Sequence, residues 1–229
     1  MKKVFEMICV LLCLISIIVW QLLADSSSYY LISIAVLIIS MLPFFFSFEH
    51  SKPDARELSL LASLIAIAVV SRAVFYLIPQ VKPIGAVVIV SGVCLGAKRG
   101  YLVGAFSAFI SNFIFGQGMW TPFQMVALGL VGFAAGLIFT KLKVKKISLA
   151  FVGFVLTFVL YSIIVDLSSV LMLAGDFSLH SVLAVYSAGF LFNFVFGIAT
   201  AVFLYFFGEQ FIRKVERIQI KYGIGVAYE

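Results

Sequence analysis

Long apolar stretches separated by short polar segments dominate this sequence. They run over residues 4–24, 29–48, 57–78, 83–97, 100–116, 122–140, 147–174 and 182–212. Most are close to the roughly 20 residues that an α-helix needs to cross about 30 Å of hydrocarbon. Their apolar residues are continuous and do not alternate with polar ones, which excludes a β-barrel and leaves helices as the spanning structure. The pattern predicts an all-α membrane protein with about eight spans.

The composition supports this class and excludes a soluble fold. The chain is 64% hydrophobic and 11% charged, whereas a soluble domain is about 45–50% apolar and about 25% charged. The net charge of +6 does not indicate nucleic-acid binding, because the basic residues are spread among short loops. Lys2 and Lys3 followed by an apolar run resemble a signal peptide, but the run is long and no small-residue cleavage site follows it. We therefore expect this run to be a retained span.

The distribution of Lys and Arg indicates the orientation in the membrane. Fourteen of the sixteen lie in the N-terminus, in the C-terminal tail or in the segments 49–56, 98–99 and 141–146. The alternate loops hold only Lys82, and Arg72 lies inside a predicted span. Cytoplasmic loops are enriched in Lys and Arg. The sequence therefore predicts that both termini are cytoplasmic.

Polar residues divide the chain into three parts. The first two predicted spans contain almost no polar side chain and end in a charged linker, whereas the later six contain the intramembrane charges. We expect an accessory two-helix hairpin at 1–50, a six-helix working module at 57–212 and a basic cytoplasmic tail at 213–229. Within the module, glycine recurs every four residues from Gly92 to Gly104, which indicates close helix packing.

Two ionisable residues lie well inside the predicted spans, where charges are costly and usually functional. Counted along their spans, Arg72 and Asp166 both reach the outer third of the bilayer. They are candidates for a structural salt bridge, and equally for a polar pocket that opens to the outside. These two interpretations are compatible, because a charged pair can also line a cavity.

A polar turn lies at the same outer level. Asn112 precedes it, Gln117, Trp120 and Gln124 lie within it, and two glycines there allow close approach of a ligand. The amides can form hydrogen bonds and the indole offers a flat stacking surface. Three tyrosines at similar depth, Tyr76, Tyr161 and Tyr186, are more typical of interface anchors. Asn193 is predicted nearer the middle of the membrane, where it can bond a neighbouring helix.

Motifs for catalysis and for metal binding are missing from the sequence. It contains no H-E-x-x-H, G-x-S-x-G or phosphate-binding loop. His50 and His180 are predicted on opposite sides of the membrane, so they cannot form a shared metal site. We expect no enzymatic activity, no metal and no cofactor bound by this chain, and ATP-driven transport would need a separate ATPase.

Over residues 57–212 the chain resembles the substrate-binding S components of energy-coupling factor (ECF) vitamin transporters. The first helix of that family carries an Ala-x-x-x-Ala patch that contacts the coupling subunit, and Ala62 and Ala66 match it. The stretch from Asn112 to Gln124 is most similar to S components for cobalamin or its precursors.

This resemblance implies a vitamin receptor in the plasma membrane of a bacterium, with cobalamin as the favoured ligand. It also implies a transmembrane coupling (T) subunit and two cytoplasmic ATPases, which would bind the ATP and Mg²⁺. The pocket would use the six residues Arg72, Asn112, Gln117, Trp120, Gln124 and Asp166. The alternatives are an S component for another vitamin or a cobalamin precursor, and a solitary secondary transporter, although no internal repeat is evident.

Overall fold

The structure is a computed structural model that describes residues 54–118, 120–173 and 178–224, together with positions 39 and 42. The regular elements in this part of the chain are all helical. They are α3 (Ala55–Val74), α4 (Ile84–Leu95), α5 (Ala97–Phe115), α6 (Thr121–Ile138), α7 (Lys146–Val155), the π-helical segment η1 (Leu156–Tyr161), α8 (Ser162–Leu173), α9 (Leu179–Phe203), the π-helical segment η2 (Leu204–Gly208) and α10 (Glu209–Tyr222).

These helices follow the six predicted spans of the working module. Four continuous segments are long and apolar enough to cross a membrane: Ala55–Val74, Thr121–Ile138, Lys146–Leu171 and Leu179–Tyr222. The all-α prediction is therefore confirmed for the described residues. The predicted spans 4–24 and 29–48 lie outside these residues, apart from two single positions, so the total of eight spans stays a prediction.

The short helix α4 differs from the predicted span 83–97. It has 12 residues, or about 18 Å of helix, which is less than the hydrocarbon thickness. Most of its residues are buried, and it contacts α3, α5, α6 and α9. A helix that is apolar all round is expected at such a central position. In this structure α4 forms the centre of the bundle.

Glycines allow the central helices to approach closely. A Cβ atom added to Gly92 of α4 would lie 2.1 Å from the carbonyl oxygen of Gly132 in α6. One added to Gly104 of α5 would lie 2.2 Å from the carbonyl oxygen of Leu128. Gly96 instead forms the turn between α4 and α5, with a φ of 85°. The close packing that the glycine spacing predicted is therefore confirmed at Gly92 and Gly104, whereas Gly96 has a turn role.

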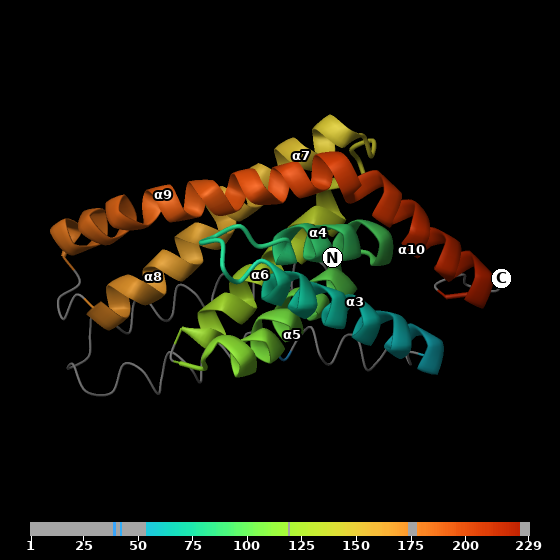
Figure 1. Cartoon of the computed structure of the whole chain (residues 1–229), viewed down its shortest axis with the longest axis horizontal. Coiled ribbons are helices and arrows are strands. Elements are labelled where there is room, and N and C mark those ends of the chain that lie inside the picture. The colour runs from blue at the N-terminus through green and yellow to red at the C-terminus, as the bar shows by residue number, and fades with distance from the viewer. Residues whose placement is uncertain (1–38, 40–41, 43–53, 119, 174–177, 225–229) are drawn as a thin grey trace.

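The helices form two groups (Figure 1). Helices α3, α4, α5 and α6 pack together, and α7, α8 and α9 run beside them. Helix α9 carries exposed apolar side chains along its length, including Phe190, Leu191 and Ile198, as expected for a lipid-facing surface. The structure differs from the prediction at the start of the tail. The last span was expected to end at residue 212, but the helix continues as α10 through Tyr222.

Candidate functional site

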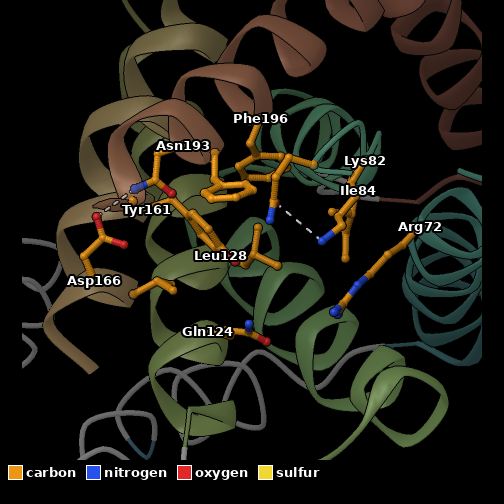
Figure 2. A pocket seen from close by; sticks show the side chains of 13 residues that line it. Arg72, Lys82, Ile84, Gln124, Leu128, Tyr161, Asp166, Asn193 and Phe196 are labelled. Carbon is orange, nitrogen blue, oxygen red and sulfur yellow. Dashed lines mark hydrogen bonds between the residues drawn. The ribbon is translucent and has the colours of Figure 1, made fainter. Parts of the chain in front are cut away.

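A cavity of about 260 Å³ lies near one end of the bundle. Its walls come from the end of α3, the loop before α4, the first turns of α4 and α6, the η1–α8 segment and the middle of α9. The lining residues are Arg72, Gln80, Lys82, Ile84, Gln124, Leu128, Tyr161, Val165, Asp166, Gly189, Phe192, Asn193 and Phe196. Figure 2 shows Asp166 and Asn193 on one side of this cavity and Arg72 on the opposite side.

One wall of the cavity is cationic. The Arg72 guanidinium donates hydrogen bonds to Ser111 Oγ at 2.6 Å and to Asn112 Oδ1 at 2.9 Å. Its Cζ atom lies 4.6 Å from the centre of the Phe115 ring, within the range of a cation–π contact. These partners are neutral, so they hold the guanidinium in place and leave its charge uncompensated.

Lys82 supplies the second positive charge of this wall. Its ammonium lies 3.5 Å from Gln80 Oε1, at the limit of a hydrogen bond. Gln80 has a φ of 60°, a left-handed conformation that is uncommon for a residue other than glycine. Burial lowers the pKa of Lys82 below its ordinary value of 10.5, and the positive charge of Arg72 lowers it further.

The opposite wall is built on Asp166, which is 8% exposed. Asn193 Nδ2 donates to Asp166 Oδ2 at 2.7 Å. A carboxylate has about four acceptor positions, and Asn193 is the one side chain in the described residues that donates to this carboxylate. Gly189 lies beside it: an added Cβ atom would be 3.0 Å from Asp166 Oδ1. The missing side chain gives the carboxylate room against α9.

Aromatic rings line the cavity between the two walls. Tyr161 of η1 packs against Phe196 of α9, with ring centres 5.0 Å apart and an interplanar angle of 58°. Phe192, one turn earlier on α9, also lines the cavity. The site therefore combines flat apolar surfaces with charged groups at both ends, a lining that is typical of small-molecule pockets.

Three of the six predicted site residues, Arg72, Gln124 and Asp166, line this cavity. A fourth, Asn112, is 1% exposed and lies behind it. Its amide donates to Gln124 Oε1 at 2.9 Å and to Thr121 Oγ1 at 3.1 Å, while its oxygen accepts from Arg72. Asn112 therefore orients two of the lining side chains.

Gln117 and Trp120 are not among the lining residues. Gln117 Nε2 donates to the carbonyl of Phe109 at 3.1 Å, and its oxygen accepts from Thr121 Oγ1 at 2.9 Å. The Trp120 ring lies against Gly118, whose added Cβ atom would be 2.4 Å from it. In this arrangement the two side chains shape the turn next to the cavity, and their predicted contact with a ligand stays a prediction.

The structure shows no ion pair between Arg72 and Asp166, both of which are described residues. Each has its own neutral hydrogen-bond partners, and the cavity lies between them (Figure 2). The pocket interpretation therefore fits the geometry, and the direct salt bridge does not.

The sequence analysis did not select Lys82 or Asn193 for the site. Lys82 could have been selected from the sequence, because it is the only basic residue in the loops predicted to lie outside. Asn193 was taken to bond a neighbouring helix, which it does, but the group it contacts belongs to the cavity wall.

Ala62 and Ala66 lie on the exposed surface of α3. Both precede Arg72 on this helix, by ten and by six residues, and neither lines the cavity. The structure therefore places the predicted coupling patch on an open helix surface and separates it from the cavity.

The apolar helices with exposed apolar surfaces define a multi-pass membrane protein of the cell membrane, with a polar cavity near one end of its bundle. A family model described as "ECF-type riboflavin transporter, S component" matches residues 52–213, which is more than half of the chain. The chain belongs to this family. No curated protein and no solved structure matched the chain.

Proposed function

We propose that this chain captures a vitamin of riboflavin size from outside the cell and delivers it as the substrate-binding subunit of an ECF-type importer. The observation that carries the proposal is the cavity of about 260 Å³, which lies within the residues matched by the family model. Its aromatic lining suits a flat ring system, and its charged and amide side chains suit the imide edge and hydroxyl groups of a flavin.

The size of the cavity supports riboflavin over cobalamin, the ligand that the sequence favoured. Ligand pockets commonly measure about 300–1,000 Å³, so this cavity lies just below that range. A corrinoid is several times larger than a flavin and would extend beyond the cavity over the turn from Asn112 to Gln124. We therefore place riboflavin first, and cobalamin or one of its precursors second because of that amide-rich turn.

Transport would require partners, because the chain carries no ATP-binding motif. We expect a transmembrane coupling subunit on the exposed surface of Ala62 and Ala66, where small side chains permit close helix contact. Two cytoplasmic ATPases would bind ATP and Mg²⁺. The chain itself would act as a receptor and not as an enzyme.

The orientation that this function needs can be tested by labelling. The cavity must face outward, with both termini cytoplasmic. In a variant without native cysteines, a cysteine at exposed Leu77 should react with an impermeant maleimide on intact cells. A cysteine at Lys143 should react only after the membrane is opened. The reverse pattern would contradict capture from outside.

Binding can be tested on the full-length purified protein by titrating riboflavin and following the loss of flavin fluorescence. Phe192→Ala removes a cavity side chain, and Leu191→Ala removes an exposed neighbour on the same helix that does not line the cavity. Loss of an aromatic contact costs about 0.5–1.5 kcal/mol beyond its buried area, so Phe192→Ala should weaken binding by roughly tenfold. Leu191→Ala should bind normally.

Cobalamin is titrated into the same preparations by calorimetry. Tight binding of cobalamin without riboflavin binding would reverse the choice of ligand. Binding of neither compound by well-folded protein would contradict both assignments.

A further inference from the structure

The charges in the cavity specify more about the ligand than its size does. Arg72 and Lys82 lie on one wall and Asp166 on the other, and all three line the same cavity. In the part of the chain that the structure describes, neither cation forms an ion pair with a carboxylate, and Asp166 has no cationic partner. Charges of opposite sign are therefore held apart across the site.

Such separation is costly unless a ligand compensates it. A charge that is partly removed from water loses hydration, and only a hydrogen-bonded partner of opposite character offsets that loss. The present partners of Arg72 are neutral oxygens, and the Asp166 carboxylate accepts from a single amide. Both walls retain unused hydrogen-bonding capacity toward the cavity.

We infer that the ligand is dipolar, with an anionic phosphate or carboxylate group held by Arg72 and Lys82 and an N–H donor group held by Asp166 and Asn193. The two aromatic rings of Tyr161 and Phe196 would contact the flat region between these ends. This inference rests on the proposed function and narrows the ligand class to compounds that carry an anionic group. Riboflavin itself is neutral and lacks that group. For a flavin, the imide N–H would meet Asp166 and a phosphate on the side chain would meet the cations.

The cationic end is tested with riboflavin and riboflavin 5′-phosphate on the full-length protein. Charge-assisted hydrogen bonds are roughly twice as strong as neutral ones, so the phosphate ester should bind roughly tenfold more tightly, which corresponds to about 1.4 kcal/mol. Lys82→Gln, in a partly exposed loop, should remove most of this advantage. Lys143→Gln is the matched control, since Lys143 is exposed and is not a cavity residue. Equal binding of the two flavins by the native protein would overturn the inference and leave the proposed function intact.

The acidic end is tested with 3-methylriboflavin, which lacks the imide N–H donor. The native protein should bind it roughly tenfold more weakly than riboflavin. Asp166→Asn keeps the shape and an oxygen for Asn193 but removes the charge, so it should narrow this difference. If Asp166→Asn prefers riboflavin over 3-methylriboflavin by the same factor as the native protein, Asp166 does not bind the N–H donor, and the assignment of this end is overturned.

If no flavin binds, the riboflavin assignment fails. The inference of a dipolar ligand is then tested separately with pairs of vitamins, each an acid and its neutral derivative. Biotin is then compared with biotinamide, and pantothenate with pantothenol. Preference for an acid that Lys82→Gln abolishes supports a dipolar ligand. Absence of any such preference overturns it.

Discussion

Asn112 accepts a 2.9 Å hydrogen bond from Arg72, a residue forty positions earlier on another helix, and so holds its guanidinium in position. Arg72 is near the end of α3 and Asn112 near the end of α5. The same Asn112 amide donates to Gln124 on α6. One buried side chain therefore links three helices and orients two cavity residues, so its effect on ligand binding is indirect.

Replacing Asn112 should affect both stability and binding. Asn112→Ala removes an acceptor of the Arg72 guanidinium, and a hydrogen bond to a charged group contributes about 1.5–3 kcal/mol. We expect the free energy of unfolding to fall by about that amount and ligand affinity to fall by roughly tenfold. Denaturation and ligand titration of the same preparation would measure both. Ser63→Ala, at an exposed serine that bonds within its own helix, should change stability by less than about 0.5 kcal/mol.

A double-mutant cycle separates this linkage from a general packing defect. If Asn112 acts through Arg72, the cost of Asn112→Ala should shrink when Arg72 is already Gln, because contacting residues are not additive. A cost that is the same in both backgrounds would show that the two side chains are independent.

Gly92 should not tolerate a side chain. A Cβ atom there would lie 2.1 Å from the backbone oxygen of Gly132, and a backbone atom of a packed helix cannot move aside cheaply. Gly92→Ala should destabilise the protein by at least about 1–3 kcal/mol through overpacking. Gly208→Ala is the matched control, because its Cβ atom would meet nothing closer than a Leu149 side-chain atom at 3.4 Å. Similar thermal unfolding temperatures for the two variants would contradict the close approach of α4 and α6.

The helices of the module could be predicted from the sequence because their signals are local. Apolar runs of the right length predicted the helices of the module, and glycines at intervals of four predicted close packing without indicating which helices meet. The burial of α4 was missed, since a run that is apolar throughout gives the same pattern for a span and for a core helix.

The site was only partly predictable. Depth along a span identified Arg72 and Asp166, but depth does not specify which way a side chain turns around its helix. Trp120 and Gln117 have the chemistry of ligand contacts, yet the local turn places the indole against Gly118 and the amide against Phe109. Lys82 lies in a loop, whose path to the cavity wall the apolar pattern of the spans does not indicate.

Lys82 makes stability depend on pH. Burial and the positive charge of Arg72 lower its pKa in the folded protein, so the folded state favours the neutral amine more than the unfolded state does. The charged amine therefore destabilises the folded state at a pH below the folded pKa. This penalty shrinks as the pH rises and is absent above the ordinary pKa of 10.5. The other ionisable groups that line the cavity are Arg72, Tyr161 and Asp166.

We therefore expect Lys82→Gln to raise the unfolding temperature of the ligand-free protein at neutral pH. The difference from the native protein should shrink as the pH approaches 10.5, because the native amine loses its charge. Thermal unfolding at several pH values would measure this, with Lys143→Gln as the control. A lower unfolding temperature for Lys82→Gln at neutral pH would show that the ammonium stabilises the empty site.

The exposed patch on α3 gives a test that separates transport from capture. Ala62→Leu with Ala66→Leu enlarges a surface that must lie close to a coupling subunit, and small residues are what allow helices in membranes to approach. Neither alanine lines the cavity, so the isolated protein should bind riboflavin with unchanged affinity while uptake by cells is lost. Copurification of the coupling subunit and ATPases should fall in parallel.

The control for this patch is Ala184→Leu with Ala188→Leu, a pair of exposed alanines with the same spacing on α9. It adds the same volume to a different helix surface, so it tests whether bulk alone disturbs the protein in the membrane. We expect uptake to persist in this variant. Loss of ligand binding in Ala62→Leu with Ala66→Leu would mean that the patch supports the fold of the receptor, and normal uptake would mean that the coupling subunit binds elsewhere.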